Sequence, residues 1–179
     1  MIVKNLQLAT IGGGCFWCTE AVFQDVRGIE KVVSGYSGGN VPGYPTYREI
    51  CSGLTGHAEV IQITFNANVI SYEDILVVFM TTHDPTTLNQ QGADRGTQYR
   101  SVIFYHDDKQ KELAELVIKE LAPYYEKTIV TEISALDTFY EAEQEHQDFY
   151  RNNKTMGYCS FVIEPKLSKL RKLHADKLK

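Results

Sequence analysis

The segment GGGCFWCTE, residues 12–20, combines three glycines, two cysteines and the only tryptophan of the chain. Cys15 opens a predicted helix, where free N–H groups and a partial positive charge lower the pKa of a thiol and favour the nucleophilic thiolate. Cys18 is spaced to face Cys15 across the first helical turn, so the pair fits a redox dithiol or half of a metal site. The structural alternatives are a small buried residue at a tight turn for Cys15 and a core cysteine for Cys18.

Two aromatic residues, Phe16 and Trp17, lie between these cysteines. Aromatic side chains usually belong to a core. Beside a nucleophile, however, they can form an apolar wall that binds a small apolar group next to the sulfur. We therefore expect Phe16 and Trp17 to shape a binding site for the group that Cys15 attacks.

Four further residues carry groups suited to acid catalysis or to binding an oxygen atom. Glu59 follows a glycine turn at the start of an apolar strand, where partial burial would raise the pKa of its carboxyl and suit it to general acid catalysis. Tyr47 lies near the end of a loop rich in Gly and Pro, and Tyr99 lies with Asp94 in the polar loop DRGTQYRS. A tyrosine hydroxyl is a neutral donor for a polar oxygen. Taken singly, each of the four fits a structural role as well, such as a solvated edge charge for Glu59.

The hydrophobic pattern predicts one α+β domain over residues 1–179. The order β-α-β-β-α-β of the first six elements matches the ferredoxin-like split-βαβ pattern, a two-layer α/β sandwich with a central mixed sheet and extended loops. The expected strands are 6–11, 29–36, 58–65, 100–105 and 129–134, and the expected helices are 15–26, 71–82, 107–123 and 139–153, with a short C-terminal helix carrying Leu167, Leu170 and Leu173.

Composition narrows the classes of function. The chain has 179 residues, a net charge of −5 and 43% hydrophobic residues, which argues for a globular protein without general affinity for nucleic acid. No window approaches the ~18 continuous apolar residues of a membrane helix. The first residues lack the long apolar region of a signal peptide, so we expect a cytoplasmic protein.

Cysteine usage bears on the remaining classes. A structural disulfide framework is not expected in a reducing cytosol, which leaves catalytic thiols or metal ligands. Cys51 and Cys159 are isolated, and the five histidines form no second close pair. Structural zinc sites use such pairs, so we expect no metal site.

Several motifs, in order along the chain, carry a resemblance to a known family: GCFWCTE, GYSGG, PTYREICSG, TGHAEV, HDPTT and GTQYRSVIFY. They resemble the peptide methionine sulfoxide reductase A family over nearly the whole chain, from about Leu8 to Lys166. The resemblance implies an enzyme that reduces methionine-S-sulfoxide, peptide-bound and free, to methionine without a cofactor. It also implies a role in protein repair and antioxidant defence under oxidative stress.

By this resemblance, Cys15 is the nucleophile that attacks the sulfoxide sulfur and becomes a sulfenic acid, the reversible first step of cysteine oxidation. Phe16 and Trp17 are implied to form the pocket for the terminal methyl group of the substrate. Sulfur–aromatic and methyl contacts of this kind are worth ~0.3–1.5 kcal/mol.

The resemblance also assigns the four polar residues. Glu59 matches the acid that protonates the sulfoxide oxygen, which is a poor leaving group without a proton. Tyr47 and Tyr99 match the hydroxyls that help to hold this oxygen. Asp94 matches the residue that organises the pocket, against the backbone amine of the substrate.

Turnover needs a second thiol that attacks the sulfenic acid and closes an intramolecular disulfide, which thioredoxin or a dithiol then reduces. Cys159 matches a family position that resolves the sulfenic acid from a mobile tail, and Cys18 is the alternative. We favour Cys159, because residues one turn apart at a rigid helix start are poorly placed for a relaxed disulfide. Against this, the segment after Cys159 looks too regular for a mobile tail. Cys51 is expected to be structural.

Two other classes of function stay open on the sequence. A general dithiol–disulfide oxidoreductase would use Cys15 and Cys18 without depending on Glu59, and a zinc-binding interaction module would hold stoichiometric zinc. The favoured hypothesis predicts a monomer whose partners are oxidised proteins and peptides and thioredoxin, with no nucleic acid or membrane. His146 is expected to be a surface histidine on a helix.

Overall fold

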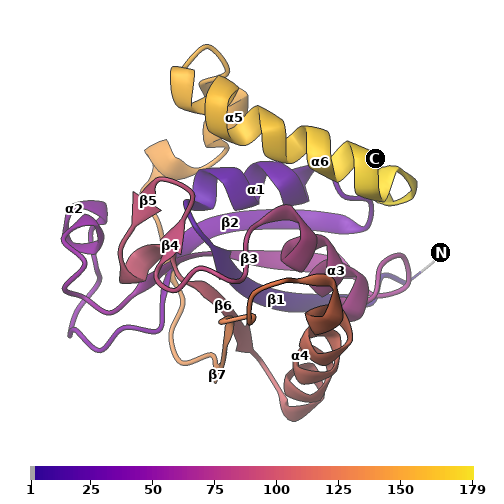
Figure 1. Cartoon of the computed structure of the whole chain (residues 1–179). Helices are drawn as coiled ribbons and strands as arrows, with labels where there is room; N and C mark the ends of the chain where they lie inside the picture. The colour runs from indigo at the N-terminus through magenta and orange to yellow at the C-terminus, as the bar shows by residue number, and fades with distance from the viewer. Residues whose placement is uncertain (1–2) are drawn as a thin grey trace.

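A six-stranded mixed sheet organises the chain in the computed structural model, which describes residues 3–179 (Figure 1). Its strands are β1 (Leu6–Gly13), β2 (Ile29–Ser37), β3 (Ala58–Asn66), β6 (Ser101–Tyr105), β7 (Glu132–Ala135) and β8 (Tyr140–Glu141). They run in the order β7-β6-β1-β3-β2-β8. The β6–β7 pair is parallel and the other neighbouring pairs are antiparallel.

The connections between these strands carry the helices and a short hairpin. The α-helices are α1 (Phe16–Gln24), α2 (Tyr47–Cys51), α3 (Tyr72–Thr82), α4 (Asp108–Leu121), α5 (Phe149–Asn152) and α6 (Glu164–His174). A π-helical turn, Cys159–Ile163, leads into α6. The hairpin pairs β4 (Gln90–Gln91) with β5 (Asp94–Arg95), and 3-10 turns lie at Thr97–Tyr99, Ala122–Tyr124, Gln144–His146 and Ala175–Lys177.

The central part of the sheet has the predicted ferredoxin-like arrangement. The chain runs β1-α1-β2-β3-α3-β6, and these four strands lie side by side in the order β6-β1-β3-β2. Two split βαβ units with antiparallel neighbours produce this order. The prediction of an α+β sandwich with a mixed sheet is therefore confirmed, and β7 and β8 extend its two edges.

The hydrophobic core lies between the sheet and the helices. Ile61, Ile63 and Phe65 alternate along β3 and are fully buried, and burying each such side chain contributes about 1.5–3 kcal/mol. In Figure 1, α1 covers the sheet and α6 lies across α1 as an outer layer. Leu167 and Leu170 of α6 are buried, so the predicted amphipathic C-terminal helix closes the core over α1.

One predicted element is wrong. Residues 139–153 form β8, a 3-10 turn and the short α5 instead of one helix. Asp148 has a left-handed backbone with φ of 52°, which interrupts a helix. The amide of Gln147 bonds the backbone of Ser34 on β2 through both its oxygen and its nitrogen. These tertiary bonds outweigh the local helical pattern.

Candidate active site

Cys15 lies in the tight connection between β1 and α1. It is the N-cap of α1, with non-helical backbone angles (φ −57°, ψ 127°), so the prediction that it opens a helix is confirmed. Gly14 before it has φ of +98°, a conformation that side chains rarely adopt. The glycine therefore allows the chain to turn from the strand into the helix and presents Cys15 at the helix N-terminus.

The electrostatics of the two thiols differ from the expectation. Burial raises the pKa of Cys15 well above its usual value, and the neighbouring Cys18 thiol and the charge of Glu59 act in the same direction. The neighbouring Cys15 thiol lowers the pKa of Cys18 to about 7, against the effect of burial and with help from the charge of Lys166. The direction for Cys15 is therefore the opposite of the predicted lowering, because burial outweighs the effect of the helix terminus.

Glu59 lies at the start of β3 beside the N-terminus of α1. Only 1% of the residue is exposed, and burial raises the pKa of its carboxyl to about 8. Its Oε2 accepts the backbone N–H of Phe16 at 3.0 Å, one of the N-terminal donors that a helix leaves unpaired. Its Oε1 has no hydrogen-bond partner within the described residues 3–179. At neutral pH the carboxyl therefore keeps a proton and has one oxygen available for a ligand.

The aromatic residues form one cluster beside this carboxyl. Phe16 is buried against Tyr36 and Tyr47, with ring centroids 5.6 and 6.3 Å away. Trp17 is half-buried and stacks on Phe149 at 3.6 Å between centroids. Both rings contact Tyr47, at 6.3 and 6.5 Å between centroids, so Phe16 and Trp17 belong to one aromatic cluster, and their role as a binding wall stays a prediction.

The two predicted tyrosines flank the same carboxyl. Tyr47 begins α2 and Tyr99 ends the 3-10 turn before β6, and both are half-buried. Burial raises the pKa of each hydroxyl, and the charge of Glu59 is the next cause in both. Both tyrosines therefore stay neutral hydrogen-bond donors near Glu59.

His146 is not the surface histidine that the sequence suggested. It is buried, and its Nδ1 accepts the indole N–H of Trp17 at 3.2 Å. Its Nε2 lies 3.6 Å from a carboxylate oxygen of Glu143. Glu143 also accepts the hydroxyl of Tyr36 and the backbone N–H of Tyr47. Because these partners converge only in the fold, the sequence gives no signal for this network.

Asp94 reaches the site through Tyr158, which sequence reasoning did not single out. The Tyr158 hydroxyl donates to Asp94 Oδ2 at 3.0 Å and lies 3.6 Å from the sulfur of Cys18. Its ring meets Trp17 edge-on at 5.7 Å. The position of Tyr158 directly before Cys159 is the one signal that could have drawn attention to it.

The remaining cysteines occupy contrasting environments. Cys159 is fully buried in the π-helical turn before α6, whereas Cys51 is exposed at the end of α2, and all four thiols are free. Over residues 3–179, no cluster of His, Cys, Asp and Glu side chains is arranged to hold a metal ion. In the same range no helix is long and apolar enough to cross a membrane.

Comparison with known proteins decides the family. The family model described as peptide methionine sulfoxide reductase matches residues 7–178. Peptide methionine sulfoxide reductase MsrA of Saccharolobus solfataricus is 53% identical over 174 residues, which cover 97% of this chain and 98% of that protein. The chain belongs to the peptide methionine sulfoxide reductase family. Its activity is the reduction of peptide methionine sulfoxide.

Further members and solved structures agree with this assignment. The reductase MsrA of Thermus thermophilus is 51% identical over 166 residues, which cover 93% of this chain and 94% of that protein. The structure of Mxr1 from Saccharomyces cerevisiae in reduced form matches with a TM-score of 0.80 and 33% identity, covering 89% of this chain and 91% of that one. Mxr1 in complex with Trx2 matches with a TM-score of 0.57 and 25% identity, covering 83% and 87%. Family and fold therefore point to the same reductase architecture.

Proposed function

We propose that this reductase acts on methionine-S-sulfoxide through a sulfenic acid on Cys15. The observation that carries the proposal is Glu59, a buried carboxyl that is protonated at neutral pH and has one unpartnered oxygen beside the helix start of Cys15. The sulfur of Cys15 attacks the sulfoxide sulfur while Glu59 protonates the sulfoxide oxygen. The oxygen ends on Cys15 as a sulfenic acid, so the Cys15 sulfur loses the two electrons that the sulfoxide gains. The proton of the Cys15 thiol replaces the one that Glu59 donated, and methionine leaves.

The side chains around Cys15 supply the substrate contacts. Tyr47 and Tyr99 donate hydrogen bonds to the sulfoxide oxygen, which the neutral state of both hydroxyls supports. Trp17 and the Phe16 behind it receive the terminal methyl group. This division between a polar side and an apolar side distinguishes the two epimers at sulfur, because exchanging oxygen and methyl would leave the carboxyl of Glu59 unpaired.

Asp94 acts at the outer end of this pocket. Its carboxylate accepts the hydroxyl of Tyr158, and Tyr158 in turn packs against Trp17. Asp94 thereby organises the pocket and offers a charge to the backbone amine of the substrate.

Cys18 is the thiol that the contacts favour for resolving the sulfenic acid. The neighbouring Cys15 thiol, the charge of Lys166 and the Tyr158 hydroxyl all lower its pKa, to about 7, and the last two remain when Cys15 is a sulfenic acid. The backbone N–H of Cys18 bonds the carbonyl oxygen of Cys15 at 3.1 Å, so closing this disulfide requires a local rearrangement of the first turn of α1. Cys159, the choice favoured on the sequence, is fully buried in a helical turn and would have to leave it to reach Cys15. The choice between them stays a prediction.

Thioredoxin is the proposed reductant of the resulting disulfide, through thiol–disulfide exchange. A solved relative supports this choice, since Mxr1 of Saccharomyces cerevisiae has been crystallised in complex with Trx2. We extend the substrates to free and peptide-bound sulfoxide and the cellular role to repair of oxidised proteins, with the enzyme acting as a monomer.

Single-turnover experiments test the first step. One equivalent of a peptide carrying methionine-S-sulfoxide is mixed with enzyme in the absence of a reductant, and methionine is quantified. We expect Cys15→Ser to form no methionine and Cys51→Ser, at an exposed thiol, to form one equivalent. Methionine formation by Cys15→Ser would refute the proposal.

Mass mapping of the same reaction identifies the resolving thiol. A Cys15–Cys18 linkage is expected, and a Cys15–Cys159 linkage would return the role to the C-terminal cysteine. An insulin-reduction assay separates the general dithiol oxidoreductase, because that activity would persist in Glu59→Gln.

A further inference from the structure

Glu20 is a buried carboxylate to which the proposed chemistry gives no role. It lies in α1 three residues after Trp17, so the two side chains are neighbours along one face of the helix. Only 1% of the residue is exposed. Burying a carboxyl without hydrogen-bond partners costs free energy, so the partners of Glu20 indicate its role in the fold.

Both oxygens of Glu20 bind the backbone of one turn that lies far away in the sequence. Oε1 accepts the N–H of Asp148 at 2.9 Å, and Oε2 accepts the N–H of Phe149 at 3.3 Å. Asp148 has the left-handed backbone noted above, which is uncommon for residues other than glycine. The two bonds from Glu20 therefore stabilise the turn in this left-handed conformation.

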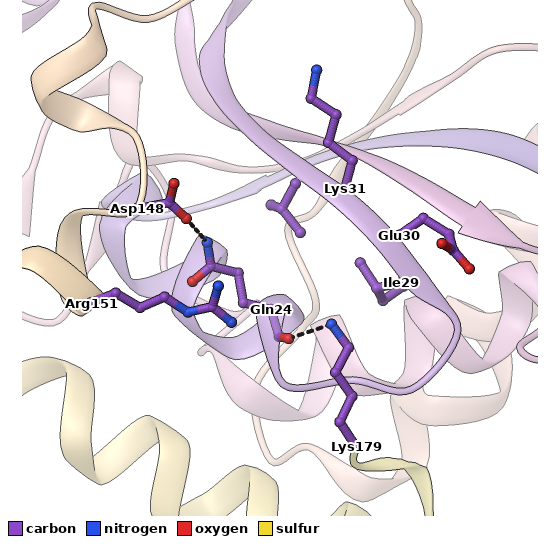
Figure 2. A pocket seen from close by; sticks show the side chains of 8 residues that line it. Gln24, Ile29, Glu30, Lys31, Asp148, Arg151 and Lys179 are labelled. Atoms are coloured by element: carbon purple, nitrogen blue, oxygen red, sulfur yellow. Dashed lines mark hydrogen bonds between the residues drawn. The ribbon is translucent and has the colours of Figure 1, made fainter.

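A second side chain of α1 also binds this turn. Gln24, one helical turn after Glu20, donates its amide to Asp148 Oδ1 at 2.6 Å. Figure 2 shows this bond at one side of a surface cavity of about 260 Å³, with Arg151 and Lys179 nearby. The turn at residues 146–149 is thus joined to α1 through two side chains of that helix.

This turn provides two of the immediate neighbours of Trp17. Phe149 stacks on the indole ring at 3.6 Å with an interplanar angle of 5°. His146 accepts the indole N–H at 3.2 Å. One contact fixes the plane of the ring and the other fixes its rotation, so the position of Trp17 depends on the position of the turn.

We propose that Glu20 is a positioning residue, which fixes Trp17 by binding the backbone of Asp148 and Phe149 and so sets the width of the methyl-binding pocket. The inference rests on the proposed role of Trp17 in binding the substrate methyl. Glu20 touches neither the substrate nor Cys15. Its effect reaches the reaction through Phe149 and His146.

The chain offers a direct readout, because Trp17 is its only tryptophan. Glu20→Gln keeps the size of the side chain and one acceptor oxygen, but its amide nitrogen cannot accept the second N–H. We expect the fluorescence emission of Trp17 in this variant to move to longer wavelength and its quenching by acrylamide to increase. Both effects should be larger in Glu20→Ala. Glu30→Gln is the matched control, since this exposed carboxylate lines the same cavity and should leave the emission unchanged.

Selectivity gives the second readout. A pocket fitted to a methyl group rejects one extra methylene by about 10- to 200-fold. We expect Glu20→Gln to lower the kcat/KM ratio of methionine sulfoxide to ethionine sulfoxide peptides by about tenfold, mainly through KM. The rate at which iodoacetamide modifies Cys15 should stay within about twofold of wild type, because the thiol is not contacted by Glu20.

Phe149→Leu provides a second test if the variants of Glu20 do not fold. It removes the ring that stacks on Trp17 and leaves the hydrogen bonds of Glu20 in place. It should reproduce both changes. Wild-type emission and wild-type selectivity in folded Glu20→Gln and Phe149→Leu would overturn the inference. Altered emission with unchanged selectivity would uphold the positioning of Trp17 and contradict instead the proposed role of Trp17 in binding the methyl group.

Discussion

Replacing Glu59 by Gln separates the stability cost of this buried carboxyl from its proposed benefit to catalysis. The pKa of Glu59 is about 8 in the fold against 4.5 for a solvated carboxyl, so between these values the folded state holds a proton that the unfolded state releases. The stability that this proton contributes is present below pH 4.5 and is lost as the pH rises through 8. At pH 7 the difference amounts to about 3 kcal/mol, at 1.36 kcal/mol per pKa unit.

A glutamine at position 59 is neutral in both the folded and the unfolded state, so the variant does not lose stability through this side chain as the pH rises. Its oxygen can accept the N–H of Phe16 as Oε2 of Glu59 does. We therefore expect Glu59→Gln to be more stable than wild type by about 3 kcal/mol at pH 7 and by less than about 1 kcal/mol at pH 5. Without a proton to donate, its kcat/KM should fall by about 10²–10⁴-fold.

Two measurements check this prediction. Urea unfolding followed by circular dichroism at pH 5, 7 and 8 gives the stability difference, and sulfoxide reduction over the same range gives the rate. Wild-type activity should fall above about pH 8 as Glu59 ionises, and the variant should lack this decline. Glu30→Gln serves as an exposed control. A variant that retains activity within tenfold, or whose added stability does not grow with pH, would refute the reasoning.

Two other substitutions probe the surroundings of the thiols. Lys166→Gln removes a charge that lowers the pKa of Cys18, so the midpoint of Cys18 alkylation, followed by mass spectrometry, should move above pH 7, and an unmoved midpoint would contradict the assignment. Gly12→Ala places a Cβ 2.6 Å from the backbone oxygen of Glu59, which should destabilise the fold by about 1–3 kcal/mol and lower the activity. The urea midpoint of this variant measures the change in stability. A wild-type midpoint would contradict the prediction and show that β3 can move away from the added methyl group at little cost.

Local patterns were sufficient for the strands β1, β2, β3 and β6 and for the start of α1. The alternation along residues 58–65 predicted β3 and the glycine run before Cys15 predicted the helix start, because each depends on neighbours in the sequence. The burial of Glu59 was also within reach, since its strand neighbours are apolar. The raised pKa of Cys15 could not be predicted in this way. The helix-terminus argument considers only the partial positive charge at the start of α1, whereas burial is the largest effect on this thiol.

The parts that the sequence did not reveal depend on long-range convergence. His146 and Tyr158 meet Trp17 from positions 129 and 141 residues further along the chain, and no short motif links them. The 139–153 segment failed as a helix for the same reason, since its conformation follows from bonds to Ser34 and Glu20. A charged residue inside an apolar helix such as α1 is usually read as solvent-facing, which concealed Glu20.

Glu20 and Glu59 show how α1 links the two sides of the site. Glu59 accepts the backbone N–H at the beginning of α1, and Glu20, inside the helix, accepts the N–H groups of the turn that packs on it. Both carboxyls are buried and have a raised pKa, so each costs stability above its unfolded pKa. Backbone donors offset part of this cost, one at Glu59 and two at Glu20. By the proposals above, these two carboxyls are the groups that fix the sulfoxide oxygen and Trp17.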